Sequence, residues 1–195
     1  MRVLWIAVAC VALLACGEDS GTSSGDAGTV ADTTAGTCPG TDGNGTEVGQ
    51  VLSDMSLTNC TGETVVLSDS LCTDKKLALI YMASGWCQPC REKQPTLQKW
   101  AEQYGPDGLE VMVILPEDNS TDPATKAFCE QWQADYGLSF PVVIDPTKKV
   151  SGPFLTGGAQ YPVVMLVDKD FKIQYKQTGA NDPDLETLIQ AYLSL

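Results

Sequence analysis

The chain has 195 residues, and 12 Lys+Arg against 25 Asp+Glu give it a formal net charge of −13 at pH 7. It contains eight Cys and no His. A surface that binds duplex nucleic acid needs clustered basic side chains to displace counterions, so an acidic chain without a basic run argues against nucleic acid as a partner. The lack of imidazole excludes catalytic triads, zinc enzymes and haem sites that depend on His. The chemistry must therefore come from Cys or from carboxylates.

The first fifteen residues have the pattern of a secretory signal peptide. Met1-Arg2 gives a positive start, and Val3–Leu14 is an apolar stretch shorter than the roughly 20 residues of a membrane-spanning helix. The stretch ends in Leu13-Leu14-Ala15-Cys16-Gly17, which resembles the lipobox of bacterial lipoproteins. This resemblance implies that residues 1–15 are removed and that Cys16 is lipidated. An ordinary cleaved signal, with Cys16 incidental, is the alternative.

After the expected signal peptide, residues 16–46 are mostly Gly, Ser, Thr, Asp and Ala. Such a composition cannot bury enough apolar surface to offset the ordering of the chain, so we expect a flexible, lipid-anchored tether. Residues 47–195 have the usual size of one domain with one core.

Within that domain, patterns of buried strands and amphipathic helices alternate. The apolar run Leu77–Met82 predicts a strand buried on both faces, and Gln88–Gln103 predicts a helix. A second buried strand is predicted over Leu109–Leu115. Asp122-Pro123 is a suitable start for the next helix, which Gly137 would end.

The remaining part of the chain predicts a short strand, a hairpin and a last helix. Pro141–Ile144 reads as the short strand, and Val163–Val167 with Phe171–Gln177 as the hairpin. Asp182-Pro183 would start the last helix. Crossover connections first and an antiparallel hairpin last predict an α/β fold with a mixed sheet and helices on both faces.

The segment Trp86-Cys87-Gln88-Pro89-Cys90 directly follows the first buried strand and opens the first helix. The partial positive charge at a helix N-terminus favours a thiolate, so Cys87 is the expected exposed attacking thiol. Cys90, about one helical turn further on, is expected to resolve the mixed disulfide. A structural disulfide between the two, or a metal knuckle, is the alternative, although no second Cys pair or His with ligand spacing accompanies them.

In these residues the chain resembles the thioredoxin superfamily, and within it the TlpA/ResA-like or redoxin-type thiol-disulfide oxidoreductases of bacterial envelopes. The resemblance covers about residues 48–195, and its motifs are Leu77–Arg91, Phe140–Asp145 and Tyr161–Asp168. It implies a thioredoxin-like three-layer fold with an N-terminal β-hairpin and a central inserted helix-strand unit.

The same resemblance implies a set of substrate-binding residues around the dithiol. The family's cis-proline loop corresponds to Tyr161-Pro162, which would face the dithiol and offer backbone groups to an extended substrate segment. An ordinary trans Pro at a strand start is the alternative. Trp86, Gln88 and Pro89 complete this expected set.

Two positions depart from the family. Thioredoxin has a buried carboxylate six residues before the first motif Cys, where this chain has Tyr81. Many TlpA/ResA-like proteins have Glu three residues after the second Cys, where this chain has Lys93, with Glu92 one place earlier. An acid-base role of Glu92 therefore stays open.

Four other cysteines remain after the expected processing: Cys38, Cys60, Cys72 and Cys129. In an oxidising compartment an even number of thiols usually pairs. Cys60 and Cys72 flank an expected hairpin turn and strand, so we predict a structural disulfide between them. Cys129 would pair with Cys38 or be a small buried hydrophobe.

The acidic run Glu117–Asp122 lacks the ligand spacing of an EF-hand, so we expect a solvated loop there. We expect no metal and no cofactor.

The expected protein is a monomeric, lipid-anchored enzyme on the periplasmic side of the bacterial cell envelope. It would reduce or exchange disulfides of exported proteins through the Cys87/Cys90 dithiol, with a membrane electron donor as its second partner. A peroxiredoxin-like peroxidase is one alternative, although no Cys lies in the Pro-x-x-x-Thr/Ser-x-x-Cys pocket which that chemistry needs. The other alternative is a non-catalytic lipoprotein of the same fold that docks a partner or delivers a metal. Against it, the chain lacks the wider Cys spacing and the His of copper carriers.

Overall fold

The computed structural model describes residues 43–158, 160–180 and 184–194. The expected signal peptide, the lipidation site Cys16, most of the expected tether and Cys38 therefore lie outside the described residues, as does Asp182-Pro183. None of the helices in these described ranges has the length and hydrophobicity of a membrane-spanning segment.

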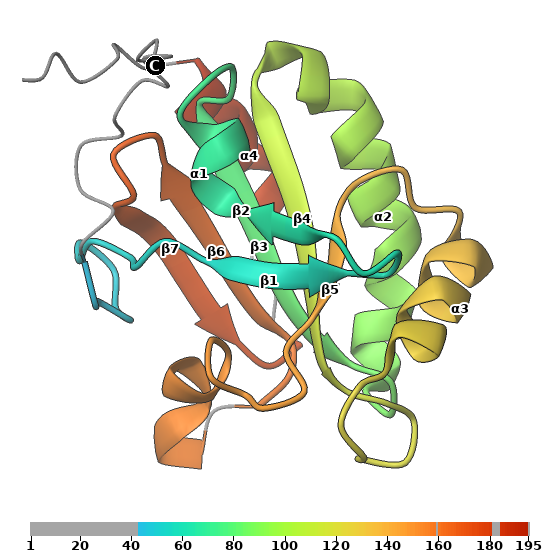
Figure 1. Ribbon diagram of the computed structural model, residues 1–195. Coiled ribbons are helices and arrows are strands. Elements are labelled where there is room, and N and C mark those ends of the chain that lie inside the picture. The colour runs from blue at the N-terminus through green and yellow to red at the C-terminus, as the bar shows by residue number, and fades with distance from the viewer. Residues whose placement is uncertain (1–42, 159, 181–183, 195) are drawn as a thin grey trace, which may run out of the picture. The chain divides into compact units, whose positions relative to one another are not determined.

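The centre of the fold is a seven-stranded mixed sheet with the strand order β2-β1-β5-β4-β3-β6-β7 (Figure 1). Strands β3, β4 and β5 are parallel to one another, and the other neighbouring pairs are antiparallel. The strands are β1 (Ser56–Asn59), β2 (Thr64–Val66), β3 (Leu77–Ser84), β4 (Leu109–Glu117), β5 (Val142–Ile144), β6 (Val163–Asp168) and β7 (Ile173–Thr178).

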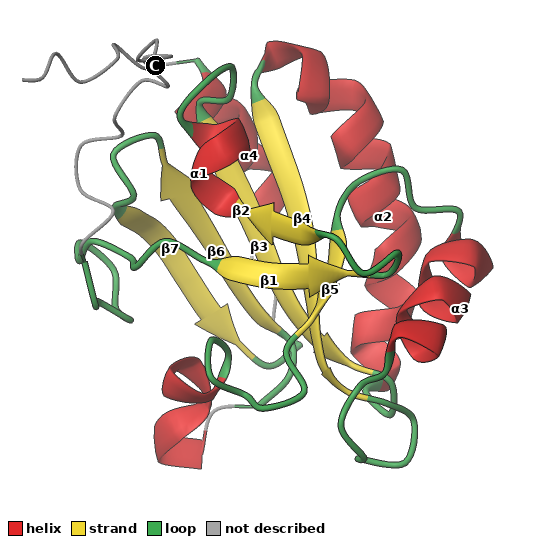
Figure 2. Cartoon of the chain, viewed as in Figure 1, coloured by secondary structure: helices red, strands yellow, loops and turns green. Residues whose placement is uncertain are grey.

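Helices cover both faces of this sheet (Figure 2). They are α1 (Leu67–Leu71), α2 (Gln88–Tyr104), α3 (Lys126–Tyr136) and α4 (Leu185–Leu193), with the short 3-10 helices η1 (Gly105–Asp107) and η2 (Gly152–Gly158). Alternate side chains of a strand point to opposite faces, so Leu79 and Tyr81 of β3 pack with α2, α3 and α4, whereas Ile80 and Met82 pack with α1 and η2. All eight residues of β3 are buried. The predicted three-layer α/β fold is confirmed.

The predicted hairpins and the inserted unit are also present. Strands β1 and β2 form the N-terminal hairpin, and β6 and β7 the C-terminal one. Helix α3 and strand β5 form the unit inserted between β4 and β6.

The start of α3 differs from the prediction. The helix begins at Lys126, and the Oγ1 of Thr125 caps it by accepting a hydrogen bond from the backbone N–H of Phe128 at 3.2 Å. Asp122 does not cap it, because its backbone N–H donates to the carboxylate of Asp118 at 3.1 Å and so closes a loop before the helix. The short helices α1 and η2 were not predicted. A segment of so few residues is too short to show the periodic spacing of apolar side chains that identifies a helix.

Candidate active site

The Cys87–Cys90 motif lies where β3 ends and α2 begins, as predicted. Cys87 is the N-cap residue of α2, and its Sγ accepts a hydrogen bond from the backbone N–H of Cys90 at 3.2 Å. Pro89 lies in the first turn of α2, where proline is tolerated because the backbone N–H groups of that turn have no partner within the helix. The Sγ of Cys87 is therefore held at the positive end of α2, where a thiolate is stabilised.

The two motif cysteines form a disulfide, with their Cα atoms 5.2 Å apart. Cys87 is 3% exposed and Cys90 is 0% exposed. The expectation of an exposed Cys87 is therefore wrong for this oxidised form. The reason is geometric, since the Sγ of Cys87 is bonded to Cys90 and turned toward the helix.

Trp86, which precedes Cys87, contacts the expected cis-proline loop. The Tyr161-Pro162 peptide bond is cis, as the family resemblance implied. The ring of Trp86 meets the ring of Tyr161 edge to face, with the ring centroids 5.7 Å apart. Trp86 remains 45% exposed, so one wall beside the dithiol is an accessible aromatic surface.

A cleft of about 320 Å³ opens between the motif and the proline loop. Pro89 and Pro162 both line it, together with Tyr81, Glu92, Lys93, Val164, Gln177, Gly179 and Ala180. Clefts with mixed apolar and polar walls are the usual place for ligand groups, and this one has room for a side chain of an extended peptide. Of the five predicted substrate-binding residues, Trp86, Gln88 and Tyr161 do not line this cleft. The side chain of Gln88 donates to the carboxylate of Glu92 at 2.8 Å.

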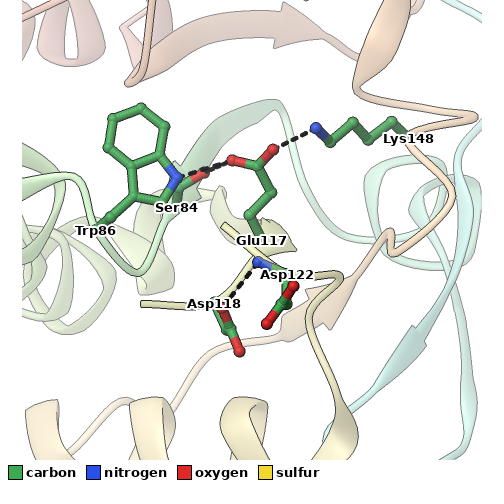
Figure 3. Close-up of polar contacts among 6 residues, drawn as sticks. All are labelled: Ser84, Trp86, Glu117, Asp118, Asp122 and Lys148. Carbon is green, nitrogen blue, oxygen red and sulfur yellow. Dashed lines mark hydrogen bonds and ion pairs between the residues drawn. The ribbon is translucent and has the colours of Figure 1, made fainter. Parts of the chain in front are cut away.

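Glu117, at the end of β4, is part of the site, and the expectation of a solvated loop is wrong for this residue. It is 8% exposed, and its carboxylate accepts hydrogen bonds from Trp86 Nε1 at 2.8 Å and Ser84 Oγ at 3.2 Å (Figure 3). Lys148 forms an ion pair with its other oxygen. Asp122, at the end of the same acidic run, is exposed as expected.

Two opposing effects act on the pKa of Glu117. Burial raises the pKa, but the hydrogen bonds from Lys148 and Trp86, the charge of Lys148 and the hydrogen bond from Ser84 together bring it below its ordinary value. The carboxylate is therefore a charged acceptor beside Trp86. No signal in the sequence separates Glu117 from the acidic residues after it, because the contact with the turn before the cysteines is made only in the folded chain.

Burial also raises the pKa of Tyr161, to about 12, and the negative charges of Glu117 and Asp145 contribute. The buried hydroxyl of Tyr161 therefore stays neutral to a higher pH than that of an ordinary tyrosine.

Gln94 is a second residue that sequence reasoning missed. It is fully buried in α2, its Nε2 donates to the carbonyl oxygen of Cys90 at 2.8 Å, and its Oε1 accepts from Trp132 Nε1 at 3.3 Å. A buried amide needs such partners. Gln94 thus connects the second motif cysteine to helix α3.

The predicted structural disulfide between Cys60 and Cys72 is wrong. Cys60 is bonded to Cys129, with their Cα atoms 5.1 Å apart, and Cys72 is disulfide-bonded elsewhere. The tertiary fold explains the difference, because β1 pairs with β5 and α3 packs on β5. Both sulfurs lie 3.5 Å from the carbonyl oxygen of Val142 in β5.

Comparison with known proteins places this architecture in a family. A model of the AhpC/TSA family matches residues 48–176. The chain belongs to the AhpC/TSA family. Among the relatives of this chain, the thiol-disulfide oxidoreductase ResA of Bacillus thuringiensis (strain Al Hakam) is 30% identical over 127 residues, covering 65% of this chain and 67% of the relative. The thioredoxin-like protein YneN of Bacillus subtilis (strain 168) is 29% identical over 135 residues, covering 69% and 74%.

Solved structures show the same fold as this chain. A Chlorobium tepidum structure assigned to the thiol:disulfide interchange protein DsbE has a TM-score of 0.63 and 25% identity, covering 76% of this chain and 99% of that one. The exposed lipoprotein thioredoxin Etrx1 of Streptococcus pneumoniae strain TIGR4 has a TM-score of 0.58 and 23% identity, covering 73% and 100%, and shows the shared fold. The predicted resemblance to redoxin-type thiol-disulfide oxidoreductases is confirmed.

Proposed function

We propose that this AhpC/TSA-family protein is a thiol-disulfide oxidoreductase whose redox centre is the Cys87–Cys90 pair. One observation carries the proposal: the pair forms a disulfide at the N-terminus of α2, with the Sγ of Cys87 as the helix cap. The relatives named as thiol-disulfide oxidoreductases support an enzyme of this type. The cleft between Pro89 and Pro162 supports a site for the substrate chain next to the reacting sulfurs.

The reaction is a pair of disulfide exchanges. In the reduced protein, the Cys87 thiolate attacks one sulfur of a substrate disulfide. A mixed disulfide forms, the substrate S–S bond breaks, and the departing sulfur takes a proton from solvent. The Cys90 thiolate then attacks the Sγ of Cys87, which forms the Cys87–Cys90 bond and releases the second substrate thiol. The substrate gains two electrons from the cysteine pair, and its two sulfurs take up protons from solvent. The two cysteines release their protons to solvent when they form thiolates.

A dithiol protein must then reduce the Cys87–Cys90 bond by the same exchange in reverse. We propose that this donor is membrane-bound and that the substrates are exported proteins of the cell envelope. The signal-like residues 1–15 and the lipobox resemblance around Cys16 support this location. A buried second disulfide, Cys60–Cys129, is typical of proteins in oxidising compartments.

The test is to trap the first step. The reduced full chain carrying Cys90→Ser is treated with 5,5′-dithiobis(2-nitrobenzoate), and the modified cysteine is mapped by mass spectrometry. We expect a stable adduct at Cys87, because the resolving thiol is missing, and rapid release of the adduct in the wild type. The matched variant Cys87→Ser should form no such adduct at the motif. Adducts that arise instead at Cys38, Cys72 or Cys129, with equal rates in both variants, would contradict the proposal.

A further inference from the structure

Glu117 contacts the turn before Cys87 through both its backbone and its side chain. Its carbonyl oxygen accepts from the backbone N–H of Gly85 at 3.1 Å, and its carboxylate accepts from the indole of Trp86. Gly85 lies so close to the loop after Glu117 that an added Cβ would stand 2.6 Å from the backbone of Asp118 and Asn119. The turn therefore rests directly on the end of β4, and glycine is needed for this approach.

The indole of Trp86 is exposed, and two contacts define its orientation. One is the hydrogen bond to Glu117 (Figure 3). The other is the edge-to-face contact with Tyr161, the residue before Pro162. An exposed side chain otherwise samples several rotamers, and ordering it costs conformational entropy. A charge-assisted hydrogen bond is strong enough to select one rotamer before a substrate arrives.

The carboxylate is itself held in place from a third element. Lys148, in the loop after β5, pairs with the oxygen of Glu117 that faces away from Trp86 (Figure 3). The buried carboxylate of Asp145 orders this loop by accepting from the backbone N–H groups of Lys149, Val150 and Ser151 at 3.1, 3.0 and 2.7 Å. Glu117 is thus fixed between the ordered loop and the indole.

We propose that Glu117 is a positioning residue of the redox site, which holds Trp86 against Tyr161 as a preformed wall of the substrate-binding surface. The inference rests on the proposed function of the Cys87–Cys90 pair. Its consequence is kinetic. Loss of the preformed wall raises the KM for a protein disulfide more than it lowers kcat, because binding then has to order the indole.

The first test follows the indole hydrogen by NMR. The chain has four Trp, and the signal of Trp86 is identified as the one missing in Trp86→Phe. In Glu117→Ala we expect this signal to shift and its exchange with solvent to accelerate roughly tenfold, as expected for a lost charge-assisted hydrogen bond. Glu117→Gln keeps the shape of the side chain, but its single acceptor oxygen cannot serve Trp86, Ser84 and Lys148 together, so a smaller change of the same kind is expected. Asp122→Asn removes a charge from the same loop and should leave the signal unchanged.

The second test is a double-mutant cycle on the reduction of insulin disulfides by the full chain. Glu117→Ala and Trp86→Phe should each raise KM, by up to about tenfold, and the double variant should be no worse than the worse single variant, because both changes remove one interaction. Effects that multiply in the double variant, or an unchanged indole signal in both Glu117 variants, would overturn the inference. An active wild type with a KM insensitive to Glu117 overturns this inference alone. A wild type that reduces no disulfide overturns the proposed function, and this inference with it.

Discussion

The side chain of Gln94 donates a hydrogen bond to the carbonyl oxygen of Cys90 at 2.8 Å, and its other end accepts from the indole of Trp132. The second cysteine of the motif is therefore linked to the inserted helix α3 through one buried amide. The same helix carries Cys129, whose disulfide ties it to the end of β1. The inserted unit is thus fixed to the active-site helix on one side and to the N-terminal hairpin on the other.

Gln94→Met should lower the free energy of unfolding by about 1–3 kcal/mol. The thioether keeps the volume of the side chain but leaves the indole N–H of Trp132 without its acceptor in a buried place. Urea denaturation measures the effect. Gln98→Met, one turn further along α2, removes hydrogen bonds in an exposed place and should cost clearly less. Equal denaturation midpoints for the two variants would show that the buried amide adds nothing.

Removal of the Cys60–Cys129 disulfide should destabilise the domain more than removal of the Cys87–Cys90 disulfide. The first joins residues 69 apart and the second joins residues 3 apart. The loss of chain entropy that a disulfide imposes on the unfolded state grows with the length of the loop it closes. The free energy of unfolding should therefore fall by roughly 4 kcal/mol in the Cys60→Ser/Cys129→Ser variant and by roughly 2 kcal/mol in the Cys87→Ser/Cys90→Ser variant. Denaturation of both variants in urea makes the comparison. A larger loss from the Cys87–Cys90 pair would contradict this ranking.

Glu117 should make the stability of the protein depend on pH in the acidic range. Its pKa is lower in the folded protein than its ordinary value of 4.5, so its contribution is complete above that value and is lost as the pH falls through the folded pKa. The difference in unfolding free energy between the wild type and Glu117→Gln should therefore shrink below about pH 4.5.

Denaturation midpoints measured between pH 3 and 7 check this. When both proteins also carry Lys148→Met, the difference in unfolding free energy should change less with pH, because Lys148 helps to lower the pKa of Glu117. A difference between wild type and Glu117→Gln that stays the same down to pH 3 would contradict the assignment.

In the reduced protein, iodoacetamide should modify Cys87 before Cys90. The Sγ of Cys87 accepts a hydrogen bond at the N-terminus of α2, which favours its thiolate, whereas Cys90 is fully buried behind it. Mass spectrometry after a short reaction identifies the modified residue, and the same reaction in denaturant, where both thiols are exposed, gives the reference. Preferential modification of Cys90 would reverse the roles proposed for the two thiols.

Local patterns in the sequence were sufficient to predict the central strands and helices of this protein and the position of the cysteine motif among them. The apolar run that starts at Leu77 has the length and composition of a strand buried on both faces, and such a pattern depends only on neighbouring residues. The same holds for the position of Cys87 and Cys90 at the start of a helix, because the turn that precedes them is short. The cis Tyr161-Pro162 bond was reached through the family resemblance.

The tertiary structure alone decided which distant residues meet. Cys60 bonds to Cys129 because β1 pairs with β5, a strand far along the chain, and no local pattern encodes that pairing. Glu117 is indistinguishable in sequence from the acidic residues after it, yet it is buried because β4 ends beside the turn that carries Trp86. Hydrophobic periodicity specifies which face of an element is buried, whereas contacts between elements depend on strand order, which only the folded chain establishes.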